Sequence, residues 1–158
     1  MSAVVRKASP EDAAAACEVL RRSIRELCTL DHKSDEELIS GWLENKTPEN
    51  VRSWLTSPRA YGVIAEHEGK ACGFGMVSKN GTVTLCYVLP EVHHSGLGRK
   101  LLSELEAQAL RWGLKTLSLE STLTAKPFYE RNGYVNAGEP VSATGSPRAY
   151  PMQKRLAL

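Results

Sequence analysis

The chain has 158 residues, a net charge of +2 and charged residues mixed along its length. This length suits one domain, residues 1–158, whose core needs no disulfide or metal. The mixed charge argues against a nucleic-acid platform, and no apolar stretch reaches the ~18 residues that cross a membrane. The N-terminal segment lacks the apolar core of a secretory signal. We therefore expect a cytoplasmic protein with no nucleic-acid or membrane partner.

The four cysteines are expected to be free, buried thiols in a reducing compartment. They form no CxxC pair, and no Cys or His pair has the spacing of zinc ligands, so we expect no metal. They are Cys17, Cys28, Cys72 and Cys86.

The first third of the chain is predicted to form a short edge strand and three helices. Each helix begins at a residue that can cap it: Ser9, Ser34 or Thr47. Pro10 fits the first helical position after Ser9, and Ser34 with Glu37 has the spacing of a capping box. The predicted ranges are 3–6 for the strand and 9–27, 34–43 and 47–55 for the helices.

After Pro58 the pattern changes to that of strands. Asn80-Gly81 is a strong signal for a two-residue hairpin turn. The strands, expected at 61–66, 71–77 and 82–89, therefore predict an antiparallel meander.

A helical period returns at Leu97 and continues to a C-cap at Gly113. A short strand, a short helix and a final pair of strands follow. Their expected ranges are 116–120, 125–131, 134–137 and 149–156. This order of elements, without repeat or linker, predicts an α/β fold.

Two glycines, Gly96 and Gly98, stand between the meander and the long helix. A helix N-terminus offers unpaired N–H groups and a positive dipole end, and the missing Cβ atoms let a phosphate come close. Arg99 and Lys100 add positive charge. An anion site and a plain tight turn both fit this spacing. The dinucleotide pattern GxGxxG does not, because Leu101 stands in place of its third glycine.

Residues 88–98, VLPEVHHSGLG, resemble the acetyl-CoA loop of the GNAT N-acetyltransferase superfamily, which has Arg/Gln-x-x-Gly-x-Gly/Ala after a V-x-P strand end. Residues 121–134, STLTAKPFYERNGY, are similar to its second signature, a short helix carrying FYxxxGF. The match covers about residues 60–137. Three positions depart from the pattern: the usual Arg or Gln is His93, the first glycine is His94, and an asparagine is Thr122.

The histidine at position 94 has a Cβ atom, so we expect ordinary backbone angles there. The two histidines either assist phosphate binding or simply fit the loop.

The resemblance implies the GNAT fold, a mixed sheet of about six to seven strands with an antiparallel N-terminal part, a splayed parallel pair and flanking helices. It implies an N-acetyltransferase that passes the acetyl group of acetyl-CoA directly to a primary amine of a small molecule or peptide. The pantetheine arm would pair with the backbone near Cys86–Val88, and an N–H near Val88 would face the thioester oxygen. The implied cofactor residues are Cys86, Tyr87, Val88, His93, His94, Ser95, Gly96, Leu97, Gly98, Arg99, Lys100 and Thr122.

The same pattern makes Tyr129 the general acid, because a phenol with a pKa of about 10 can protonate the leaving thiolate. Phe128 and Tyr134 fit the description of core aromatics. Cys86 as a nucleophile is a second route, but its context favours a buried thiol and direct transfer. The base stays open among a water chain and the side chains of Glu66, Glu120, His32 and His94.

The acceptor is expected to lie against residues 25–60 and the 138–148 loop, where such enzymes vary most. This region is locally acidic, which suits a cationic amine; its residues are Asp31, His32, Asp35, Glu36 and Glu37. A solvated helix start explains the three acids at 35–37 equally well. A non-catalytic acyl-CoA sensor on the same fold is the alternative function. We also expect a homodimer through the edge formed by the C-terminal strands.

Overall fold

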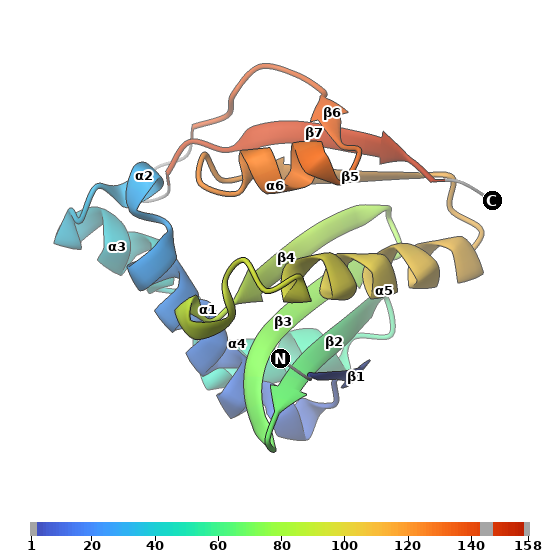
Figure 1. The fold of residues 1–158 in the computed structure, drawn as a ribbon, viewed down its shortest axis with the longest axis horizontal. Coiled ribbons are helices and arrows are strands. Elements are labelled where there is room, and N and C mark those ends of the chain that lie inside the picture. Colours follow the sequence, from blue (N-terminus) through green and yellow to red (C-terminus); the bar gives the residue numbers. More distant parts are fainter. Residues whose placement is uncertain (1–2, 143–146, 157–158) are drawn as a thin grey trace.

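The computed structural model describes residues 3–142 and 147–156, and it shows a mixed sheet flanked by helices (Figure 1). In this part of the chain the sheet has seven strands in the order β1-β2-β3-β4-β5-β7-β6. Neighbouring strands are antiparallel, except that β4 and β5 are parallel. The expected fold class is therefore confirmed. The strands are β1 (Val4–Lys7), β2 (Ala60–His67), β3 (Lys70–Ser78), β4 (Thr82–Val88), β5 (Thr116–Ser121), β6 (Val135–Asn136) and β7 (Tyr150–Arg155).

Helices cover both faces of the sheet. Leu101 of α5 packs on the face that holds Val63, whereas Leu20 of α1 packs on the face that holds Ile64. Val63 and Ile64 are adjacent in β2, and adjacent strand residues point to opposite faces. The α-helices are α1 (Ala13–Leu27), α2 (Thr29–His32), α3 (Glu36–Leu43), α4 (Pro48–Thr56), α5 (Leu97–Arg111) and α6 (Lys126–Arg131), with 3-10 turns η1 (Pro10–Asp12) and η2 (Pro90–Val92).

The helix starts agree with the sequence at two of the three predicted caps. Ser9 forms a capping box with Asp12, and the Thr47 hydroxyl accepts the N–H of Asn50 at 3.1 Å. The prediction that Ser34 caps α3 is wrong, because Ser34 lies in a left-handed turn with φ +61°. Asp35 caps the helix instead, since its carboxylate accepts the N–H groups of the first turn.

The parallel strands β4 and β5 separate soon after they meet. They pair only at Thr82–Ser118 and Val83–Leu119. A bulge then inserts Thr84 into β4, because Val83 and Leu85 face consecutive residues of β3. A bulge bends its strand, and from this point β4 diverges from β5 (Figure 1). The expected splayed pair is thus present, and one edge of β4 is left open.

The remaining strands lie where the sequence places them. The turn between β3 and β4 lies where predicted, but it takes three residues, 79–81, and not two, with Gly81 at φ +93°. The C-terminal pair forms as expected, with β7 between β5 and β6. None of the helices in residues 3–142 and 147–156 is both long and apolar enough to span a membrane.

Candidate functional site

The separation of β4 from β5 leaves a cavity of about 980 Å³, bounded by α1, β4, the N-terminus of α5 and α6. Most of the residues that the sequence assigns to the cofactor line this cavity. They are Cys86, Tyr87, Val88, His93, His94, Gly96, Gly98, Arg99 and Thr122. The cavity therefore connects the glycine loop with the open edge of β4.

Three residues assigned to the cofactor place their side chains elsewhere. Leu97 is 2% exposed and belongs to the core beneath α5. The Ser95 hydroxyl donates to the Val92 carbonyl, and Lys100 lines a separate cavity of about 290 Å³. Of Leu97, only the backbone N–H can therefore contact a ligand in the cavity.

The backbone at His94 differs from the expectation of ordinary angles. Its φ is +67°, in the left-handed region, and Gly96 two residues later has φ +88°. When left-handed residues alternate with residues of ordinary backbone angles, successive backbone N–H groups point toward the same concave side of the loop. Histidine is among the side chains that enter this region more readily than most. The His94 ring also stacks on His93 with the ring centroids 3.8 Å apart, a contact that offsets part of the strain.

The first turn of α5 supplies backbone donors next to this loop. The Lys100 N–H bonds the Gly96 carbonyl at 3.2 Å. The N–H groups of Leu97, Gly98 and Arg99 precede it and have no carbonyl of their own helix to bond. Together with the positive end of the helix dipole and the Arg99 guanidinium, they form a site suited to a phosphate or pyrophosphate.

Gly98 also determines how closely α5 and α6 approach. A Cβ atom at this position would lie 3.2 Å from Cε1 of Phe128. The glycine therefore leaves room on two sides, for the aromatic ring of α6 and for a ligand over the loop.

Desolvation lowers the pKa of the nearby His93, and His94 and Arg131 lower it further.

The open edge of β4 presents backbone groups to the cavity. The Leu89 N–H donates to Cys72 of β3 at 2.9 Å. Because N–H groups in an antiparallel strand alternate between its two sides, those of Val88 and Cys86 point away from β3. β5 no longer pairs with β4 here, so these donors face the cavity. Val88 thus meets the geometry expected for an oxyanion donor.

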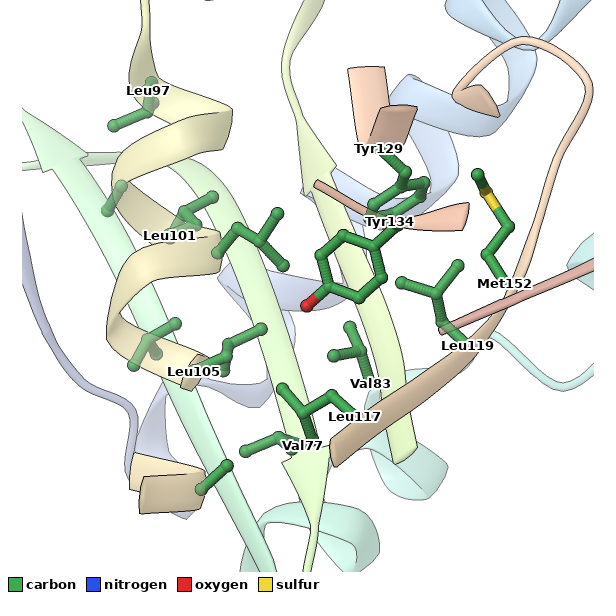
Figure 2. Close-up of a cluster of buried hydrophobic side chains, with 14 of the residues drawn as sticks. Val77, Val83, Leu97, Leu101, Leu105, Leu117, Leu119, Tyr129, Tyr134 and Met152 are labelled. Atoms are coloured by element: carbon green, nitrogen blue, oxygen red, sulfur yellow. The ribbon is translucent and has the colours of Figure 1, made fainter. Parts of the chain in front are cut away.

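Tyr129 and Tyr134 lie together in the core, but their hydroxyl groups have different surroundings. The Tyr134 hydroxyl donates to Glu106 at 2.8 Å, and it points toward α5 in Figure 2. Tyr129 is 6% exposed, is not among the residues that line the cavity, and its hydroxyl bonds none of residues 3–142 and 147–156. Burial, followed by Cys86 and Tyr87, raises the pKa of Tyr129 well above its usual value. Tyr129 therefore keeps its proton at neutral pH.

The cavity thiols are poor nucleophiles. Burial raises the pKa of Cys86 to about 12, and burial together with Asp31 does the same for Cys28. Only a thiolate attacks an acyl group, so these values favour direct transfer over a route through Cys86.

One of the four candidate bases lines the cavity, and it is His94. His32 is buried and uses both ring nitrogens, with Nε2 2.9 Å from the Ile24 carbonyl and Nδ1 accepting the Ser34 N–H. Glu66 forms an ion pair with Arg6 at 2.7 Å. Glu120 is exposed on β5 and does not line the cavity.

The acids expected to favour a cationic amine bind other parts of the protein. Asp31 accepts the N–H groups of Leu123 and Thr124, Asp35 caps α3, and Glu36 pairs with Arg25 at 2.9 Å. These three carboxylates therefore already hold groups of the protein itself, whereas Glu37 is exposed. Part of the 138–148 loop, residues 143–146, lies outside the described residues.

Several cavity residues were not anticipated. Arg131 and Asn132 follow Phe128 by three and four positions, so the helical spacing of α6 could have placed them on the same face. Ser23 and Cys28 of the α1 wall carry no such signal, because only the folded chain brings them to β4.

The site can be compared with known proteins. A family model described as an acetyltransferase (GNAT) domain matches residues 29–156. An uncharacterized N-acetyltransferase of Mycobacterium bovis is 26% identical over 97 residues, and one of Mycobacterium tuberculosis matches equally. The alignment covers 57% of this chain and spans 62% of the relative's length.

Solved structures share the fold over nearly the whole chain. A GCN5-related N-acetyltransferase from Rhodopseudomonas palustris has a TM-score of 0.87 and 25% identity, covering 99% of this chain and 97% of its own. The PaiA N-acetyltransferase of Thermoplasma acidophilum, solved with coenzyme A, has a TM-score of 0.81 and 23% identity, with 98% and 99% covered. An acetyltransferase structure from Salmonella typhimurium with acetyl-CoA has a TM-score of 0.76 and 21% identity, with 100% and 96% covered.

Proposed function

Because this chain belongs to the GNAT acetyltransferase family, we propose that it transfers the acetyl group of acetyl-CoA directly to a primary amine of a small molecule or peptide. The main observation that supports this proposal is one continuous cavity that extends from the glycine loop to the open edge of β4. Two proteins of the same fold hold coenzyme A or acetyl-CoA. The free cysteines suit the reducing cytoplasm in which we place the protein.

The glycine loop binds the pyrophosphate in this proposal. The first N–H groups of α5 and the Arg99 side chain provide hydrogen bonds and positive charge. Gly96 and Gly98 keep the surface free of Cβ atoms, so the phosphates can reach the backbone.

The open edge of β4 binds the pantetheine arm and stabilises the reacting carbonyl. The peptide groups of Cys86 and Val88 pair with the arm as a neighbouring strand would. The Val88 N–H then donates to the thioester oxygen as negative charge develops on it, an interaction that grows stronger toward the transition state.

Transfer forms a bond between the amine nitrogen and the acetyl carbon and breaks the bond from that carbon to sulfur. Tyr129 gives its phenolic proton to the departing thiolate, and the proton released by the attacking amine restores the phenol, directly or through water. Burial disfavours the phenolate, so Tyr129 stays protonated until the thiolate departs, and the loss and return of its proton are concerted. An amine that arrives as the ammonium ion first loses one proton to His94 or to a water chain, which passes it to solvent.

The test is release of free coenzyme A thiol from acetyl-CoA, measured with and without a panel of amines. The proposal predicts that at least one amine raises thiol release well above the rate without amine. A non-catalytic sensor would bind acetyl-CoA, seen as a rise in Tm, and would release no additional thiol with any amine. Absence of acetyl-CoA binding would contradict both functions.

A further inference from the structure

Asp31 of α2 follows the cavity-lining Cys28 by three residues and bonds a wall of the cavity that is far away in the sequence. Its Oδ1 accepts the Leu123 N–H at 2.6 Å. Its Oδ2 accepts both the N–H of Thr124 at 3.0 Å and the hydroxyl of Thr124 at 2.6 Å. Hydrogen bonds to a carboxylate are roughly twice as strong as those between neutral groups, so this is the strongest polar link between α2 and the segment that precedes α6.

The α2 side of this link is firmly held. His32, the next residue, is 1% exposed, and its Nε2 lies 2.9 Å from the Ile24 carbonyl near the end of α1. Its Nδ1 accepts the N–H of Ser34, and its ring meets Trp42 of α3 edge-on with the centroids 6.2 Å apart. Asp31 therefore extends from a short helix that is anchored to both α1 and α3.

The other side of the link is a wall of the cavity. Thr122, Thr124 and Ala125 all line it. The Thr122 hydroxyl accepts the Ala125 N–H at 3.0 Å. The turn is therefore held by a hydrogen bond of its own as well as by its hydrogen bonds to Asp31. Beyond the turn begins α6, which carries Tyr129.

The link lies toward the reacting end of the cavity. The charge of Asp31 acts on Cys28 and Tyr87, two cavity residues whose pKa values it helps to raise. Tyr87 neighbours Val88, the donor assigned to the thioester oxygen, whereas the phosphate loop is built from residues of η2 and α5.

We propose that Asp31 is a positioning residue that fixes the Thr122–Ala125 wall, and with it the start of α6, against α1 and α2 at the acyl and acceptor end of the cavity. The inference rests on the proposed function. Asp31 touches neither the phosphate loop nor Tyr129 in the described contacts. Its loss should therefore impair transfer far more than it impairs cofactor binding, since small misplacements of reacting groups are costly.

The test compares Asp31→Asn and Thr124→Val with a matched control, Asp35→Asn. Asp35 is also a carboxylate that accepts two backbone N–H groups of the same region, but those groups belong to α3. Each full-length protein is measured for Tm, for the Kd of coenzyme A, and for kcat and KM with an amine that the unmodified protein acetylates.

We expect Asp31→Asn to lower kcat/KM for the amine about tenfold or more while the Kd of coenzyme A changes less than about threefold. Thr124→Val, which removes one hydroxyl, should lower kcat/KM for the amine several-fold. The double variant should be no worse than Asp31→Asn alone, because both changes remove the same interaction. Asp35→Asn should change Tm little, because asparagine caps a helix about as well as aspartate, and it should leave kcat/KM within about twofold.

Equal kcat/KM in Asp31→Asn and Asp35→Asn would overturn the inference, as would additive losses in the double variant. If Asp31→Asn does not fold, unchanged turnover in Thr124→Val overturns it in the same way. Failure of the proposed function itself is distinct, because the unmodified protein would then acetylate no amine, whether or not it binds coenzyme A.

Discussion

Tyr129 and Tyr134 are five residues apart, with ring centroids 5.6 Å apart, yet only one of them has a free hydroxyl group in the described structure. Sequence pattern favoured Tyr129 as the acid and Tyr134 as core. The structure supplies a physical reason, since the Tyr134 hydroxyl is engaged with Glu106, which also binds Lys154 at 3.2 Å. Tyr129 and Tyr134 therefore form a natural pair of test and control.

We predict that Tyr129→Phe lowers kcat by about 10²–10⁴-fold, the usual contribution of a general acid. The ring and its packing are kept, so Tm should change little. Affinity for acetyl-CoA should also stay nearly constant, because the hydroxyl meets the sulfur as charge develops. Steady-state kinetics, calorimetry and thermal unfolding on one preparation measure all three.

The control, Tyr134→Phe, should show the opposite result. It removes a hydrogen bond to a carboxylate, so Tm should fall by about 3–6 °C while kcat stays within about threefold. If Tyr129→Phe keeps its turnover within about threefold, water protonates the thiolate and Tyr129 is a core residue.

At the scale of the elements, the two ends of α5 differ in what they face. Arg99 lines the cavity at the N-terminal end, whereas Arg111 lies in the last turn and bonds Gln108 at 3.0 Å. Charge at the N-terminal end acts directly on a bound anion. Arg111 lies twelve residues further along α5, which is about 18 Å at the rise of an α-helix, well beyond the ~8–10 Å over which salt screens charge.

We predict that Arg99→Glu weakens coenzyme A binding about tenfold or more in calorimetry at moderate salt. Arg111→Glu makes the same change of charge on the same helix and should alter the Kd by less than about threefold. Equal effects of the two variants would show that the phosphates bind elsewhere.

The junction of β1 and η1 depends on an ion pair that responds to pH. Hydrogen bonds from Arg6 lower the pKa of Asp12 to about 2. A lowered pKa means that the folded state favours the ionised carboxylate. Its stabilisation is therefore complete well above the unfolded pKa of about 3.9 and is lost as the pH falls through the folded value.

We predict that Asp12→Asn, which keeps an oxygen for the Ser9 N–H, lowers the free energy of unfolding by about 1–2 kcal/mol at pH 7. The difference from the unmodified protein should shrink to about half by pH 3. Urea unfolding at both pH values measures it, and a difference independent of pH would rule out this ion pair as the cause.

Sequence predicted those elements whose signals are local. The Asn80-Gly81 turn, the Thr47 cap and the glycine loop each depend on neighbouring residues, and each was placed correctly. The predicted cap at Ser34 is wrong because Asp35 can cap the helix equally well and the sequence does not distinguish the two. The turn of the chain at Ser34 in the folded structure leaves Asp35 as the cap. The left-handed backbone at His94 was not predicted, because a residue with a Cβ atom usually has ordinary angles and the contact with the His93 ring is seen only in the folded chain.

The candidate site was predicted only in part for a similar reason. Its loop and its tyrosine belong to recognisable motifs. The α1 wall and the Asp31 link join residues about ninety positions apart, and nothing in the sequence marks such a contact. The bonds of Asp31 to Leu123 and Thr124 were therefore not predicted.

At the scale of the whole molecule, the sheet ends in two edges. At one edge, Val135 on β6 is 59% exposed, and at the other Val4 on β1 is 66% exposed. Strand β6 is only two residues long and pairs with Gln153 and Met152 of β7. Exposed apolar edges favour association.

We predict that two chains associate through the β6–β7 edge, giving a dimer mass in light scattering. Val135→Asp should shift the mass toward the monomer, whereas Val4→Asp at the opposite edge should not. A monomeric mass for the unmodified protein across working concentrations would contradict this prediction.

The central claim, that the chain is an acetyl-CoA-dependent N-acetyltransferase, is tested most directly by mass spectrometry of an amine array incubated with the protein and acetyl-CoA. Tyr129→Phe serves as the matched blank, since it should bind the cofactor with its active-site packing intact. We predict that one or more amines gain a single acetyl group with the unmodified protein and gain far less with Tyr129→Phe. An array in which no amine gains an acetyl group, while acetyl-CoA binds, would contradict the claim and favour the sensor.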